Sequence, residues 1–165
     1  MLKKMWICLF LCMFLCGCAQ QPVFETLGDV EHLIGERPAM GTMTVQLPQE
    51  AAAQTLGTGD GTMYDCEGYT LVMHTTSAGD FSKTVQQLSG FTPENLTIME
   101  TQMGENKRYE WVWTAATEDG DVLCRAAVLD DGTYHYCMSA MAQADLAGQL
   151  TTQWNALFAS FCLGQ

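Results

Sequence analysis

The sequence predicts an α+β domain in which an antiparallel β-sheet of about six or seven strands packs against a C-terminal amphipathic helix and a shorter internal helix. Two observations carry this prediction. In the second half of the chain, four segments of strand composition follow one another across short turns rich in Gly, Asp and Asn, and turns this short join antiparallel neighbours. An apolar stripe at helical spacing then closes the chain, which is typical of a helix that covers a sheet.

The first elements of the domain are short strands and a loop. Residues 43–47 alternate apolar and polar side chains, as a half-buried strand does, and Pro48 ends this pattern. Residues 49–61 are rich in Ala and Gly and predict a loop. Residues 62–66 and 69–76, rich in Tyr, Val, Thr and Met, predict two strands of a hairpin.

An internal helix is predicted between two punctuating residues. Asp80 is a favourable N-cap, apolar side chains repeat at helical spacing over residues 81–88, and Gly90 ends the pattern. Residues 92–94 predict one further helical turn.

Four strands then form a predicted meander, over residues 96–103, 108–115, 122–130 and 133–142. Tyr109, Trp111 and Trp113 share one face of the second of these strands, an aromatic ladder of the kind that joins a sheet to a covering helix. Asp145 is the predicted cap of that covering helix. Its apolar stripe consists of Leu146, Leu150, Trp154, Leu157, Phe158 and Phe161.

The N-terminus has the features of an export signal. Lys3 and Lys4 precede an apolar run over residues 5–15, which as a helix rises only about 16 Å and is too short to remain as a transmembrane span. The residues that follow resemble the bacterial lipoprotein signal, with Leu15, Cys16 and Gly17 before Cys18. This resemblance implies a signal peptide over residues 1–17 and lipidation of Cys18.

The predicted organisation therefore has three parts: the signal peptide, a lipidated N-terminus and tether over residues 18–39, and a sandwich domain over residues 40–165. Removal of residues 1–17 leaves five basic groups against nineteen acidic ones, so the formal charge changes from −12 to −14. Such a chain lacks the clustered cations that nucleic-acid binding requires. It also lacks the charge to dock on anionic lipid, so we expect the lipid on Cys18 to hold the protein on the extracytoplasmic face of the membrane.

The arrangement of elements resembles the PsbP/Mog1-type sandwich of small exported bacterial proteins. The resemblance rests on the strand after the helix that ends at Gly90, on the hairpin at residues 131–134, and on a final helix that ends with residues 159–161. It implies a binding or assembly-assisting module without catalytic residues, whose protein or envelope partner the sequence does not name.

Four cysteines remain beyond the leader and Cys18, and they are candidates for disulfides: Cys66, Cys124, Cys137 and Cys162. If residues 131–132 form a two-residue turn, Cys124 and Cys137 are diagonal neighbours on one face of the sheet. If residues 130–132 form a three-residue turn, the two point to opposite faces and either could meet Cys162. Buried, reduced thiols are the alternative to disulfides.

No catalytic, cofactor or metal motif stands out. His74 and His135 lie inside predicted strands, and His135 shares a strand face with Cys137, but the spacing supplies no further metal ligand. His32 belongs to the tether. We therefore expect a non-enzymatic, membrane-anchored envelope module without a cofactor. The alternative is a small envelope hydrolase that uses carboxylates and a histidine.

Overall fold

The computed structural model describes residues 39–55 and 61–164 of the chain. These residues belong to one unit, Arg37–Gln165. The predicted signal peptide with Leu15, Cys16 and Gly17, the predicted lipidation site Cys18, and His32 of the predicted tether lie outside the described residues. Within the described ranges, no helix combines the length and the apolar character needed to cross a bilayer.

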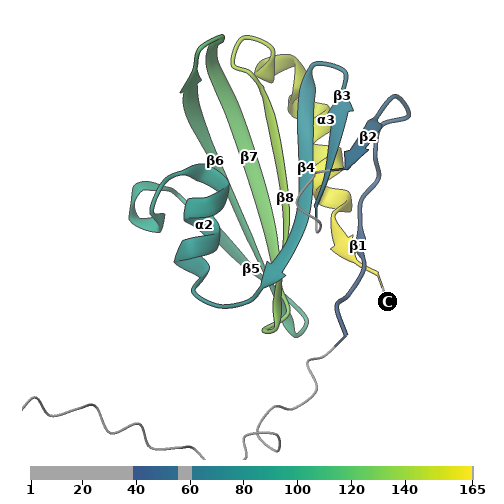
Figure 1. The fold of residues 1–165 in the computed structure, drawn as a ribbon, viewed down its shortest axis with the longest axis vertical. Coiled ribbons are helices and arrows are strands. Elements are labelled where there is room, and N and C mark those ends of the chain that lie inside the picture. Colours follow the sequence, from purple (N-terminus) through teal and green to yellow (C-terminus); the bar gives the residue numbers. More distant parts are fainter. Residues whose placement is uncertain (1–38, 56–60, 165) are drawn as a thin grey trace, which may run out of the picture. The chain divides into compact units, whose positions relative to one another are not determined.

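The described strands form a seven-stranded antiparallel sheet in the order β2-β3-β4-β8-β7-β6-β5 (Figure 1). Its members are β2 (Ala52–Thr55), β3 (Gly61–Cys66), β4 (Tyr69–Ser77), β5 (Met99–Met103), β6 (Asn106–Thr117), β7 (Gly120–Asp130) and β8 (Tyr134–Gln143). A separate two-stranded ladder joins β1 (Met43–Thr44) to β9 (Cys162–Leu163). The α+β class, the meander β5 to β8 and the hairpin β3–β4 are confirmed.

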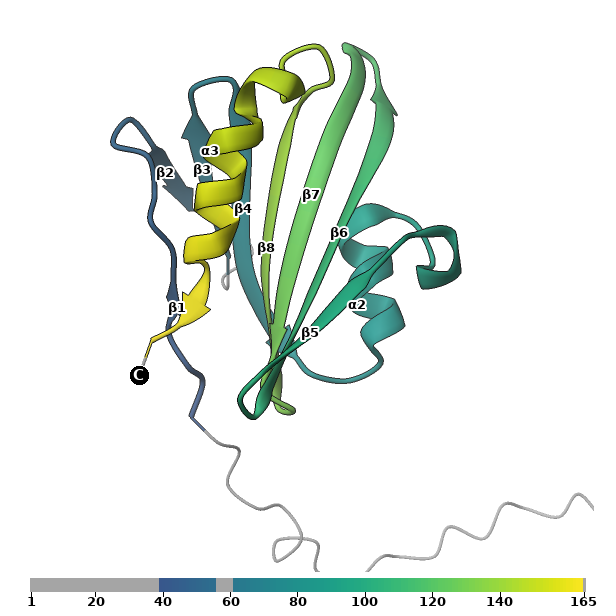
Figure 2. The ribbon, with the colours of Figure 1, turned by 180° about the vertical axis from the view of Figure 1, so that it is seen from behind.

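Two helices lie on opposite faces of the sheet, as a comparison of Figure 1 with Figure 2 shows. α2 (Phe81–Ser89) starts at Asp80, whose carboxylate accepts a hydrogen bond from the Ser82 N–H, and ends at Gly90, which adopts φ 77°. η2 (Pro93–Asn95) adds the expected turn after α2. α3 (Ala147–Ser160) covers the other face, over β3, β4 and β8 (Figure 2).

Each helix buries its own apolar cluster against the sheet. The cluster under α3 contains Trp154, Leu157 and Phe158 of the helix, packed on side chains of β4 and β8 such as Leu71 and Met138. The cluster under α2 contains Val85 of the helix with side chains of β6, β7 and β8: Tyr109, Trp111, Ala126, Val128 and Cys137. The core therefore has two halves, separated by the sheet itself.

The aromatic ladder faces α2, which corrects the expectation that the C-terminal helix covers it. Phe81 of α2 packs on Tyr109 at 4.0 Å between ring centroids, and Trp111 stacks on Trp113 at 6.3 Å. Because side chains alternate between faces, the α3 side of β6 carries Arg108 and Glu110 instead. The sequence pattern identified the shared face, but it did not identify which helix covers that face.

The other differences lie at the ends of elements. The predicted loop at 49–61 contains strand β2, which pairs with β3. Of the predicted strand at 43–47, residues 43–44 form β1. β1 pairs with the short strand β9, which sequence reasoning missed. α3 begins after Leu146, which is the N-cap and makes no side-chain capping bond. The prediction that Asp145 caps this helix is therefore wrong.

The turn between β7 and β8 lies farther along the chain than in either predicted alternative, over residues 131–133. Asp130 pairs with His135, and in this register Cys124 pairs with Met141 while Cys137 pairs with Val128. Cys124 and Cys137 therefore share the α2 face but stand four residues apart in register, about 13 Å along the strand. A disulfide requires Cα atoms within about 7 Å, so both register predictions for this pair are wrong.

Candidate functional site beside the C-terminal helix

His135, one of the two histidines considered for a hydrolase site, is buried under α2. Its Nδ1 lies 2.8 Å from the Thr84 hydroxyl, and its Nε2 lies 3.7 Å from a carboxylate oxygen of Asp130. The arrangement places a hydroxyl, an imidazole and a carboxylate in a row. However, His135 is only 1% exposed and Thr84 only 5% exposed, so no substrate reaches the hydroxyl in this conformation. Burial lowers the pKa of His135, and the charges of Asp130 and Asp131 only partly oppose that effect. The contacts therefore fasten α2 to β8.

The other candidate residues do not form a reactive or metal-binding group. His74 lies opposite Cys137 in the β4–β8 ladder, and burial lowers the pKa of His74. Burial raises the pKa of the Cys137 thiol to about 12, which makes it a poor nucleophile. In the part of the chain that the structure describes, no three His, Cys, Asp or Glu side chains gather closely enough to hold a metal ion.

All four candidate disulfide cysteines are free thiols in the structure. Cys66, Cys124 and Cys137 are buried, whereas Cys162 is exposed in β9. The Cys162 sulfur lies 3.0 Å from the Thr44 hydroxyl of β1. The three buried thiols occupy core positions, as small apolar side chains do.

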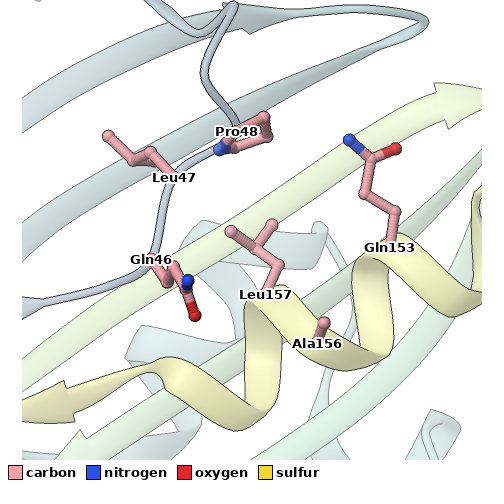
Figure 3. Close-up of a pocket in the computed structure, with 6 residues that line it drawn as sticks. All are labelled: Gln46, Leu47, Pro48, Gln153, Ala156 and Leu157. Carbon is pink, nitrogen blue, oxygen red and sulfur yellow. The ribbon is translucent and has the colours of Figure 1, made fainter.

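Two open hollows lie along one side of α3. The first, of about 230 Å³, lies between α3 and the segment at residues 46–48 (Figure 3). The second, of about 350 Å³, lies between α3 and the β3–β4 turn at Glu67-Gly68. Gln153 lines both hollows, and we refer to them together as the α3 groove.

The lining of the α3 groove is aliphatic with amide side chains. Leu47, Pro48, Leu150 and Leu157 supply apolar surface, and Glu67 is its one carboxylate. The amide groups come from Gln46, Gln149 and Gln153. Amides donate and accept hydrogen bonds without charge, and they therefore suit a neutral polar ligand such as a peptide backbone. No group in this lining is a histidine or a thiol.

Buried ionic contacts hold the far end of α3 in place and so fix the helical wall of the groove. Arg108 donates to the carbonyls of Phe158 and Phe161 at 2.6 and 2.8 Å at the end of the helix, where the Phe158 carbonyl also accepts from the Phe161 N–H at 3.3 Å. Its Nε donates to Glu110 at 2.7 Å, and Glu110 also accepts from Arg125 at 2.8 Å. Burial alone would raise the pKa of Glu110, but Arg125 and Arg108 outweigh that effect and hold the pKa below its usual range.

The opposite wall is held at the same end of the helix. The Gln46 N–H donates to the Ser160 hydroxyl at 2.9 Å, and β1 pairs with β9 directly after α3. Nearby, the Gly41 N–H donates to the Tyr136 hydroxyl at 2.8 Å, and that hydroxyl donates to Asp131 at 2.7 Å. A Cβ at Gly41 would lie 3.2 Å from the Tyr136 oxygen, so the close approach favours glycine. The first described residues are therefore held at the end of the sheet that carries the β7–β8 turn.

Acidic side chains gather at the other end of the sheet. The β3–β4 turn, the β6–β7 turn and the β8–α3 loop all lie at that end (Figure 1). These segments carry Glu67, Glu118, Asp119, Asp121 and Asp145. A hollow of about 570 Å³ lies among Asp119, Asp121 and Asp145. This end therefore presents a strongly negative surface.

No protein-family model and no curated protein sequence matches the chain. Solved structures do resemble it. LpqN, which is involved in cell envelope biogenesis of Mycobacterium tuberculosis, matches with a TM-score of 0.53 and 14% identity over 78% of this chain and 86% of LpqN. CyanoP, the cyanobacterial PsbP of Synechocystis sp. PCC 6803, matches with a TM-score of 0.55 and 11% identity over 85% of this chain and 100% of CyanoP. The predicted PsbP-like fold is thereby confirmed.

Proposed function

We propose that this protein is a lipoprotein anchored through Cys18 to the extracytoplasmic face of a bacterial membrane, and that its domain binds an envelope partner in the α3 groove. The signal-like residues 15–18 support the anchor. The similar protein LpqN is involved in cell envelope biogenesis, and this supports an envelope role by analogy.

The observation that carries the binding function is the contrast between the α3 groove and the histidine group. The groove is open and has a lining that can hold a ligand but does not supply an acid, base and nucleophile together. The His135 group has the chemical types of a hydrolase but is buried under α2. For the alternative function as a hydrolase, α2 would have to leave the sheet. Covalent labelling of Thr84 by a fluorophosphonate would support that alternative.

Replacement of Cys18 tests the anchor. Cys18→Ala should move the protein from the membrane fraction to the soluble fraction and abolish metabolic labelling by a palmitate analogue. Cys162→Ala removes an exposed cysteine from the folded domain and is the matched control, which should stay membrane-bound and labelled. A Cys18→Ala protein that remains labelled would contradict the lipidation site.

Photo-crosslinking in native membranes tests the groove. A benzophenone amino acid at Gln153 should capture one envelope component reproducibly, and the same probe at Gln87, exposed on α2, should not capture it. Ala156→Trp fills the groove and should remove that product. Ala159→Trp changes another exposed alanine of α3 that does not line either hollow, and it should leave the product unchanged. Equal capture by the two tryptophan variants would sink the assignment of the groove.

A further inference from the structure

Strand β5 is an edge of the sheet in which Glu100 is the one charged side chain. All five residues of β5 are exposed, and the strand order ends with it. Edge strands are commonly protected from pairing by Lys, Pro or a bulge. The sequence of β5 is Met-Glu-Thr-Gln-Met and contains neither Lys nor Pro. Its outer edge therefore offers backbone groups to another strand.

An exposed apolar strip runs beside this edge, on the same face of the sheet as α3. Met99 and Met103 are 60% and 44% exposed, and Val112 of β6 is 50% exposed. The register pairs Met99 with Glu110 and Met103 with Asn106, so both methionines lie on the face that carries Val112. α3 covers the other half of this face (Figure 2). Among the described residues, three of the seven exposed large apolar side chains thus lie on this face of β5 and β6, with Met99 beside Val112 and Met103 about 13 Å farther along β5.

We propose that two copies of this protein pair through antiparallel β5 strands, with Thr101 at the two-fold axis. In this register Met99 of one copy lies opposite Met103 of the other, Glu100 lies opposite Gln102, and Thr101 lies opposite its own counterpart. The strand is therefore self-complementary, as an isologous interface requires. The two sheets become one continuous sheet, and the two apolar strips meet on one face.

The charges of the edge select this register over its neighbours. A shift by two residues in one direction places Glu100 opposite Glu100, and like charges directly opposite destabilise a strand pair. The same shift in the other direction moves Met99 beyond the end of the partner strand. In the proposed register each Glu100 faces a neutral amide and keeps its ion pair with Lys107 at 3.0 Å. A shift by one residue would turn the methionines of the two copies to opposite faces.

The pairing rests on the proposed lipid anchor for its strength. One five-residue strand pair buries less than the roughly 1,200–2,000 Å² of standard stable interfaces, so free copies should pair weakly. Copies confined to one membrane meet at a high effective concentration, and this favours weak contacts. The acidic turns, which would repel each other in a dimer, lie at the end of the sheet away from the β5–β6 turn (Figure 1).

Disulfide crosslinking of the full chain in native membranes tests the pairing. In a Cys162→Ala background, Thr101→Cys should give a dimer on non-reducing gels after oxidation with copper phenanthroline. Met99→Cys and Met103→Cys should each stay monomeric when expressed alone and should give a mixed dimer when expressed together. Palmitate labelling of the same membranes reports the anchor separately. Labelled, membrane-bound protein that gives no Thr101→Cys dimer would overturn the pairing alone.

A charge variant tests the same register without a cysteine at the axis. Thr101→Lys, introduced into both the Met99→Cys and the Met103→Cys proteins, places two ammonium groups opposite each other. It should lower the yield of the mixed dimer at least tenfold. Gln54→Lys adds the same charge to β2, the opposite edge of the sheet, and should leave the yield unchanged. Equal yields in the two variants, or crosslinks only to a different protein, would refute pairing between copies of this chain.

Discussion

Arg108 is the residue whose loss should most weaken the attachment of α3. Its guanidinium is buried and makes hydrogen bonds to two carbonyls at the end of α3 and to the carboxylate of Glu110. Arg108→Met keeps a long apolar side chain at the position but removes every donor. The Phe161 carbonyl then loses a buried donor, the Phe158 carbonyl keeps the Phe161 N–H at 3.3 Å, and Glu110 keeps Arg125.

The expected loss follows from these contacts. A buried acceptor without a partner costs about 1–3 kcal/mol, and breaking a buried ion pair from one side costs about 3–5 kcal/mol. The two effects overlap because one guanidinium makes all the bonds, so we expect a loss of about 3–5 kcal/mol in the free energy of unfolding. A domain of this size has only about 5–15 kcal/mol in total, so the variant should remain folded but unfold at a much lower denaturant concentration.

Urea unfolding at pH 7, followed by tryptophan fluorescence, measures this loss. Lys107→Met is the matched control, because Lys107 is the adjacent residue and its ion pair with Glu100 lies at the surface. That control should leave the unfolding midpoint nearly unchanged. The stabilisation should also weaken in acid: the pKa of Glu110 is lower in the folded state, so its contribution is complete above the unfolded pKa, about 4.5, and is lost as the pH falls below it. A loss below about 1 kcal/mol for Arg108→Met would refute the reasoning.

Three further predictions concern other buried groups. Burial lowers the pKa of His135 below 6.5, so the unfolded chain binds more protons than the folded protein, and the free energy of unfolding should fall as the pH drops from about 6.5 towards the folded pKa. His135→Gln should reduce this pH dependence when unfolding is measured between pH 5 and 8. Tyr136→Phe leaves the Gly41 N–H without its acceptor and should cost about 1–2 kcal/mol, with faster hydrogen exchange at Gly41; unchanged exchange would show that this contact does not hold the segment. Mass spectrometry after alkylation without reductant should find Cys162 modified quickly in the native protein and Cys137, with a pKa of about 12, only after unfolding; a disulfide at either cysteine would contradict the free thiols.

Local signals in the sequence located most of the elements. The capped helix between Asp80 and Gly90 depends on contacts within a few residues, and the structure reproduces both caps. The β3–β4 hairpin and the β5–β8 meander follow from strand composition and short turns, which restrict neighbours to antiparallel pairing. Strand β2 carried no such signal, because alanines at a sheet edge lack the β-branched and aromatic side chains by which strands are recognised.

The candidate sites depended on distances that the sequence does not contain. The turn at residues 131–133 is held by the Asp131 carboxylate, which accepts from the N–H groups of Thr133 and Tyr134, and its position farther along the chain changed the register of the two cysteines beside it. The α3 groove joins residues about one hundred positions apart, such as Gln46 and Gln153. No spacing rule connects such residues, so sequence reasoning missed the groove.

The sequence by itself determined the class of the domain, its acidic charge and the helical and strand segments, because each depends on composition or on residues close in the chain. Only the tertiary structure decided which helix covers which face. The alternation of β6 places its aromatic side chains on one face and Arg108 with Glu110 on the other, but either face could receive a helix. Packing resolved this choice: Phe81 of α2 contacts the aromatic ladder, and Arg108 donates to two carbonyls at the end of α3.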